Sequence, residues 1–184
     1  AMKKISTVFK KDPSNLALVV NEVNPENQWV LDGEGVATRK WDGTACAVID
    51  GVLYKRYDVK KGKSVPVGAI PCQEPDGVTG HWPHWVKCER GNPGDKYHWE
   101  AWDLYPGYVE DGTYELIGPK INGNNEGWSE HVFQAHGNRT IDVFSRSFDN
   151  LKWLLGERNI EGIVFHHPDG RMAKIRKTDF GIKI

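Results

Sequence analysis

The chain has 184 residues, which suits a single domain over residues 1–184 and suffices to bury a core. Its 24 Lys and Arg residues against 25 Asp and Glu residues give a net charge of −1, so no global positive field marks a nucleic-acid-binding protein. Eight Trp, six Tyr and six Phe supply core-sized side chains and exclude a disordered chain.

Short extended runs broken by Gly, Pro, Asn and Asp predict mainly β-structure. The expected strands are residues 35–40, 45–49, 52–57, 98–104, 112–118, 162–166 and 171–176. A helix is expected near residues 15–22. A second is expected over 149–156, where Leu151, Leu154 and Leu155 follow helical spacing and either Ser147 or Asp149 can cap the N-terminus.

Two turn signals predict hairpins. Asp50-Gly51 separates the second and third expected strands, and Pro168-Asp169-Gly170 separates the last two. Residues 60–92 are rich in Pro and Gly and predict one extended, ordered loop region. The sequence therefore predicts an α+β domain built mainly on antiparallel sheet.

The expected surroundings are cytoplasmic. No apolar run approaches the roughly 18 residues of a membrane-spanning helix, and the basic start of the chain is followed by no signal-peptide core. Three cysteines form no disulfide framework and suit a reducing compartment. We expect free thiols and no membrane partner.

The first chemically informative feature is Lys40, at the end of an expected strand and directly before the turn at Asp42-Gly43. By itself this pattern is typical of an ordinary solvated turn. Glu115 lies within a later expected strand, Glu161 directly precedes another, and Lys174 lies in the last one, so charged groups follow in an ordered series. Together these residues weigh against reading Lys40 as part of an ordinary turn.

Five segments resemble the ordered motifs of the covalent nucleotidyltransferases, which include ATP-dependent RNA ligases, DNA ligases and mRNA capping enzymes. The segments are Lys40-Trp41-Asp42-Gly43, Arg56, Tyr114-Glu115-Leu116-Ile117-Gly118, Glu161-Gly162-Ile163-Val164-Phe165 and Lys174-Ile175-Arg176. The Gly-Pro pair after the third motif is more similar to RNA ligases, and compact RNA ligases are the most similar group. The resemblance implies an ATP-grasp-like adenylation domain with flanking helices. We expect no OB domain, because seven residues follow Lys177.

The resemblance implies roles for these side chains. Lys40 would take AMP from ATP, Glu161 would hold Mg²⁺ or Mn²⁺, and Glu115 would accept hydrogen bonds from the ribose. Arg56 would lie near the phosphate or ribose, and Asp42 would shape the turn that presents Lys40. The expected substrates are ATP and RNA with 5′-phosphate and 3′-OH ends.

Physical reasons support the basic residues in this pattern. An amine attacks phosphorus only when neutral, and about one free lysine in a few thousand is neutral at pH 7. Burial, nearby cations and a bound metal must therefore act together to activate Lys40. Lys174 and Arg176 lie two apart on one strand face and can stabilise the charge that develops on the α-phosphate. The related motif usually has lysine where Arg176 stands, and Arg176 cannot be deprotonated.

The resemblance also implies an aromatic side chain that stacks on the base. Phe133 is the first choice, Phe144 and His136 compete, and a buried core residue is the alternative for either Phe. Trp82 and Trp85, near basic residues, are candidates for contact with RNA bases.

Alternative interpretations remain open at this point. A GTP-specific capping-type transferase and a ligase of DNA ends use the same motifs, and a non-catalytic RNA-binding module could retain the fold. Separately, a loop with zinc-ligand residue types, Cys72, His81, His84 and Cys88, is a weak candidate metal site because its spacing is not that of a standard zinc finger.

Overall fold

The computed structural model describes residues 3–184 and divides them into two compact units. Of the described residues, unit 1 holds Lys3, Lys4 and residues 42–136, and unit 2 holds residues 5–41 and 137–184. The boundary between Trp41 and Asp42 falls just after Lys40. The single domain expected over residues 1–184 stays a prediction.

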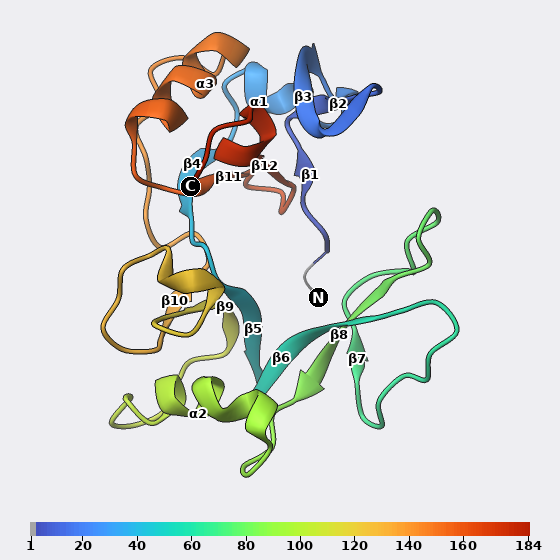
Figure 1. Ribbon diagram of the computed structural model, residues 1–184, viewed down its shortest axis with the longest axis vertical. Coiled ribbons are helices and arrows are strands. Elements are labelled where there is room, and N and C mark those ends of the chain that lie inside the picture. The colour runs from blue at the N-terminus through green and yellow to red at the C-terminus, as the bar shows by residue number, and fades with distance from the viewer. Residues whose placement is uncertain (1–2) are drawn as a thin grey trace. The chain divides into compact units, whose positions relative to one another are not determined.

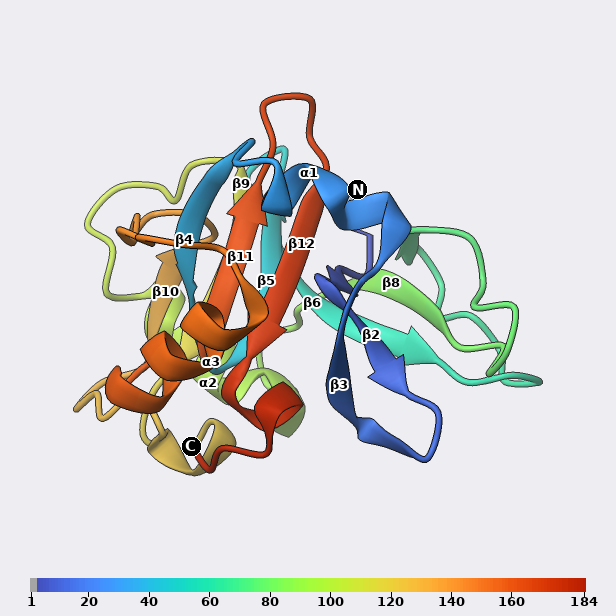
Figure 2. The same ribbon diagram turned by 90° about the horizontal axis from the view of Figure 1, so that it is seen from above.

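Unit 2 is built on a four-stranded sheet with the order β1-β12-β11-β4. Its strands are β1 (Ser6–Thr7), β4 (Val36–Lys40), β11 (Gly162–His166) and β12 (Met172–Arg176). The remaining elements are the hairpin β2 (Phe9–Asp12) and β3 (Asn15–Val23), the short helices η1 (Pro25–Asn27), α1 (Gln28–Leu31) and η4 (Lys177–Phe180), and α3 (Phe148–Glu157). Figure 2 shows β4, β11 and β12 side by side with α3 over them.

One face of this sheet forms the core of unit 2. Ile163 and Phe165 of β11 and Ala173 and Ile175 of β12 are fully buried there. The α3 helix adds its three leucines, Leu151, Leu154 and Leu155, to the same cluster. Because side chains alternate along a strand, the intervening residues of β11 and β12 project from the opposite face.

Unit 1 is built on a six-stranded antiparallel sheet with the order β10-β9-β5-β6-β8-β7 (Figure 1). Its strands are β5 (Thr44–Ile49), β6 (Val52–Val59), β7 (Ile70–Pro71), β8 (Trp82–Lys87), β9 (Gly112–Ile117) and β10 (Val132–Ala135). Its helices are η2 (Pro93–Asp95), α2 (Lys96–Trp102) and η3 (Asn122–Asn124). Buried side chains of β5, β6, β9 and β10 pack with α2 on one face.

The structure confirms the α+β class and the main local predictions. The β5–β6 and β11–β12 pairs are antiparallel hairpins, and Asp50 and Gly51 both have positive φ at the first turn. The Ser147 side chain accepts a hydrogen bond from the Asn150 backbone N–H, so Ser147 rather than Asp149 caps α3. All three cysteines are free thiols, as expected.

Three element predictions were wrong. Residues 98–104, expected as a strand, lie largely in α2, where Trp99 and Trp102 meet edge to face one helical turn apart. Residues 15–22, expected as a helix, lie in β3, which pairs with β2. Residues 60–92 are not one loop, because they contain β7 and β8.

Within residues 3–184, no helix has the length and apolar character needed to cross a membrane.

Candidate functional site

Unit 2 brings three of the predicted site residues, Lys40, Lys174 and Arg176, onto one face of its sheet. The register places Lys40 opposite Gly162, and Gly162 opposite Arg176. Lys174 lies opposite Val164 on the same face, which is the face away from the unit's core. Lys40, Gly162 and Arg176 are thus aligned across three neighbouring strands. Because Gly162 has no side chain, no side chain lies between those of Lys40 and Arg176.

Lys40 forms an ion pair with Glu161. Its Nζ donates a hydrogen bond to Glu161 Oε2 at 2.9 Å. The two side chains are only 23% and 10% exposed, so water screens their attraction less than that of a surface pair. The predicted nucleophile and the predicted metal carboxylate are therefore direct neighbours.

The neighbourhood of Lys174 is electropositive. Burial is the main cause that lowers the pKa of Lys174 to about 8, and the positive charges of Arg176 and Lys40 act in the same direction. Glu161 and Asp179 oppose this effect. Three cationic side chains close to one another form a surface that suits a phosphate group.

Asp179 holds Arg176, which the sequence analysis did not anticipate. Its buried carboxylate accepts hydrogen bonds from the Arg176 backbone N–H at 2.8 Å and from Arg176 Nη2 at 2.9 Å. Lys11 Nζ donates to the same carboxylate at 2.8 Å. Burial is the largest single influence and favours the neutral forms of both Arg176 and Asp179. Hydrogen bonds and opposite charges, including Lys11, together outweigh it, so the pKa of Arg176 is raised and that of Asp179 is lowered. Asp179 therefore fixes the direction of the guanidinium.

Lys177 differs from Lys174 and Arg176. Its side chain is buried, and its Nζ donates a hydrogen bond to the Leu155 carbonyl of α3. This contact directs Lys177 to α3 and not to the face that holds Lys174 and Arg176.

In unit 1, the turn after Lys40 is held by side-chain hydrogen bonds. The Asp42 carboxylate accepts hydrogen bonds from Asn122 at 2.9 Å and Asn125 at 2.7 Å, and its backbone N–H donates to Glu126. A Cβ at Gly43 would clash with the Leu116 carbonyl of β9. Hydrogen bonds and lack of space therefore constrain the backbone at Asp42 and Gly43. The role of Asp42 in presenting Lys40 stays a prediction.

Glu115 and Arg56 lie on one face of the unit 1 sheet. Glu115 is opposite Ala45 and Arg56 is opposite Trp85, and these residues belong to the face away from α2. Glu115 Oε1 lies 2.8 Å from His136 Nε2, and the other ring nitrogen of His136 lies 2.9 Å from the Thr113 hydroxyl. His136 therefore orients the carboxylate that the resemblance assigns to the ribose.

Phe133 lies on the other face of that sheet. It is 5% exposed and packs near Tyr105 and Tyr114 in the cluster under α2. Because β10 places it one residue from Gln134, which pairs with Glu115, its side chain projects away from the Glu115 face. These surroundings match the core alternative, and a role in stacking on a base stays a prediction.

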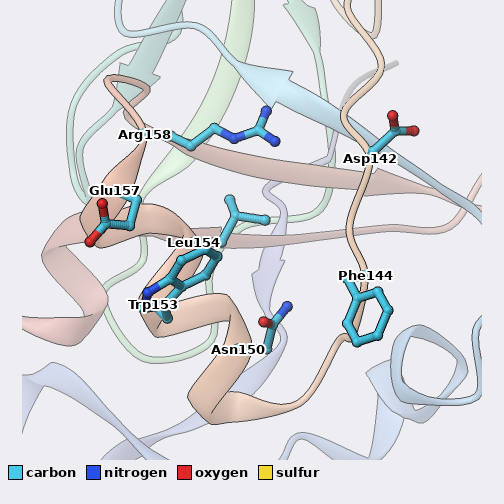
Figure 3. A pocket seen from close by; sticks show the side chains of 7 residues that line it. All are labelled: Asp142, Phe144, Asn150, Trp153, Leu154, Glu157 and Arg158. Carbon is cyan, nitrogen blue, oxygen red and sulfur yellow. The ribbon is translucent and has the colours of Figure 1, made fainter.

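The competing candidate Phe144 is exposed beside a pocket in unit 2. Its side chain is 99% exposed, and Trp153 of α3 is 64% exposed. Figure 3 shows the residues that line this pocket of about 170 Å³, which are Asp142, Phe144, Asn150, Trp153, Leu154, Glu157 and Arg158. None of the basic or acidic residues predicted to handle the nucleotide is among them.

The four residues weighed as a zinc set do not come together as one cluster. Among residues 3–184, the single metal-ligand group that the structure assembles contains Cys88 but none of the other three. Cys72 is buried beside Trp85, and His81 lies 3.2 Å from Asp58. Trp85 is 2% exposed, which leaves no surface for an RNA base.

Comparison with known proteins gives relatives but no family model that matches the chain. The chain is similar to proteins named RNA ligase 1. The protein of that name from Mus musculus is 27% identical, over 98% of this chain and 83% of its own length. Those from Rattus norvegicus and Pongo abelii are 27% and 28% identical, over 80% and 65% of this chain and 67% and 49% of their own lengths. The similarity to the mouse protein is thus not confined to a single motif.

Proposed function

We propose that the chain is an ATP-dependent RNA ligase that joins a 5′-phosphate end to a 3′-OH end through a lysyl-AMP intermediate at Lys40. The observation that carries the proposal is the ion pair of Lys40 with Glu161 on a sheet face that also holds Lys174 and Arg176. The relatives named RNA ligase 1 support the enzyme class and the RNA substrate.

The proposed reaction has three steps. Lys40 Nζ loses a proton and bonds to the α-phosphorus of ATP while pyrophosphate leaves. The RNA 5′-phosphate then attacks the adenylyl phosphorus, which frees Lys40 and gives a 5′-5′ pyrophosphate end. The 3′-OH attacks the 5′-phosphate of that end, AMP leaves, and a 3′-5′ phosphodiester forms.

Each basic residue has a proposed part in the first step. Lys174 and Arg176 contact the α-phosphate as its negative charge grows. Asp179 acts as a positioning residue through Arg176. We also propose the implied roles of Glu115 toward the ribose and of Arg56 toward the ribose or phosphate.

The donor chemistry of Glu161 suits Mg²⁺ or Mn²⁺, since such ions take one or two carboxylates together with phosphate oxygens and water. When bound there, the ion would offset the charge of the phosphates. Lys40 shares the carboxylate with any such ion, so Glu161 both orients the lysine and supplies an oxygen ligand.

The test is intact-mass analysis after incubation with ATP and Mg²⁺, in parallel with GTP. We expect a mass gain of one AMP on the parent protein with ATP alone, and none on Lys40→Ala. The control Lys152→Ala removes an exposed lysine from α3 and should form the adduct as the parent does. Ligation assays with matched RNA and DNA ends then test the choice of polynucleotide.

An adduct with GTP alone would instead support a capping-type transferase, and joining of DNA ends alone would support a DNA ligase. Parent protein that is folded, carries no AMP at the start and gains no adduct with either nucleotide would contradict the enzyme proposal and favour a binding module.

A further inference from the structure

Unit 1 contains a group of metal-ligand side chains with no part in the proposed nucleotide chemistry. Cys88 follows β8, Asp95 ends η2 and His98 lies in the first half of α2. One donor atom from each lies within 4.8 Å of the other two. Sulfur, carboxylate oxygen and imidazole nitrogen are the three ligand types that zinc proteins use.

The three side chains are enclosed by protein. Cys88 is 2% exposed, Asp95 is 0% exposed and His98 is 7% exposed. Both ring nitrogens of His98 are buried without a hydrogen-bond partner. Buried polar atoms are almost always satisfied, so an unpartnered imidazole beside a thiol and a carboxylate points to a ligand.

The charges around the group are compatible with a cation. Asp95 accepts hydrogen bonds from Lys55 Nζ and from the Glu89 backbone N–H, so its two oxygens are oriented before any ion binds. Lys55 is paired with Asp95 and would share its carboxylate with the ion.

We propose that Cys88, Asp95 and His98 bind one Zn²⁺ ion. Zinc bonds of roughly 2.0–2.3 Å place tetrahedral ligand atoms about 3.5 Å apart, which a small contraction of this group would give. The Cys88 thiol would release its proton to solvent, and water would complete the tetrahedron. A thiolate ligand disfavours Mg²⁺, so this ion differs from the one proposed at Glu161.

The proposed ion would join the end of β8 to the start of α2. Asp95 is the N-cap residue of α2, and Ala101 of the same helix packs in the cluster over the sheet. Zinc would therefore hold α2 against the strands that carry Glu115 and Arg56. This inference does not depend on the proposed ligase activity.

The experiment uses the full chain, stripped with a chelator and titrated with Zn²⁺ against a chromophoric competitor. We expect one equivalent of Zn²⁺ per chain. Co²⁺ in its place should show a thiolate-to-cobalt charge-transfer band. Cys88→Ser should lose that band, and Cys88→Ser and His98→Asn should each weaken zinc binding by about 100-fold or more.

The matched controls are Cys72→Ser and His81→Asn, which change two of the three other residues that the sequence analysis grouped with Cys88. They should bind Zn²⁺ as the parent does. X-ray absorption of the parent's zinc should show one sulfur ligand, a measurement that holds even if a variant fails to fold.

Less than a tenth of an equivalent of zinc on the folded parent protein would overturn the proposal. So would zinc without a sulfur ligand, unchanged binding in folded Cys88→Ser, or loss of binding in Cys72→Ser or His81→Asn.

Discussion

Lys174 and Arg176 show how two basic residues on one strand can be held in different ways. Asp179 compensates the charge of Arg176 through a buried pair. For Lys174, the nearby carboxylates of Asp179 and Glu161 raise the pKa less than burial lowers it. The protein therefore holds Lys174 as a destabilised charge that a phosphate would relieve.

Replacing Lys174 by methionine should stabilise the protein at pH 7. The fall of the Lys174 pKa from 10.5 to about 8 corresponds to at most about 3 kcal/mol, so we expect Lys174→Met to gain about 1–3 kcal/mol in the free energy of unfolding. Between about pH 8 and pH 10.5 the unfolded chain keeps a proton on Lys174 that the folded protein has lost, so the parent's free energy of unfolding rises with pH. The advantage of Lys174→Met over the parent therefore shrinks as pH increases. Adenylylation of Lys40 should fall by about 100-fold.

Urea unfolding of parent and variant at pH 7 and pH 10 measures this effect. The control Lys152→Met removes an exposed charge and should change the free energy of unfolding by less than about 0.5 kcal/mol at both values. A Lys174→Met protein that is less stable than the parent at pH 7 would contradict the argument.

At the scale of elements, the close approach of β11 and β12 depends on Gly162. A Cβ there would lie 2.5 Å from the Ile175 carbonyl oxygen and 3.0 Å from Arg176 Cα. Both are backbone atoms of the neighbouring strand and cannot rotate away. The glycine after Glu161 thus has a steric role in bringing β12 against β11.

We expect Gly162→Ala to lower the free energy of unfolding by about 1–3 kcal/mol, because the strands must separate to admit the methyl group. The same change at Gly156 in α3 should raise it by about 0.5–1 kcal/mol, because a Cβ there meets its nearest atom at 4.0 Å and alanine favours helix. Urea unfolding of both variants checks the contrast. Equal changes in the free energy of unfolding for the two variants would show that the close approach of β11 and β12 does not prevent a side chain at residue 162.

At the scale of the whole molecule, the residues with proposed nucleotide roles come from both units. Glu115 belongs to unit 1, and Lys40, Glu161, Lys174 and Arg176 belong to unit 2. The net charge of −1 is nearly neutral, so the proposed affinity for ATP and RNA depends on local groups such as these and not on a global field.

A non-transferable ATP analogue with a methylene bridge between the α- and β-phosphorus should stabilise the parent. At a free concentration 100 times its Kd with Mg²⁺, we expect about 2.7 kcal/mol more free energy of unfolding. At that same concentration Glu115→Gln and Lys174→Met should each gain less, and the exposed control Glu157→Gln should gain as much as the parent. Thermal unfolding with and without the analogue measures this, and full stabilisation of Glu115→Gln would exclude its proposed role.

The sequence by itself determined the features that depend on neighbouring residues. Asp50-Gly51 and the segment before Arg171 favour tight hairpins, and Ser147 with the leucine spacing after it specifies α3. The α+β class and the order of the chemical motifs follow from the same local patterns. These predictions hold because turn geometry, capping and periodicity act within a few residues.

Only the tertiary structure decided the features that depend on contacts between distant segments. Pairing with β2 makes residues 15–22 a strand, and packing on the sheet accompanies a helix at 98–102. Asp179 carries no motif, yet its contact with Arg176 gives it a role. Cys88 meets His98 and Asp95 through the packing of α2. Burial and charge compensation in three dimensions determine these contacts. The spacing of residues along the chain does not encode them.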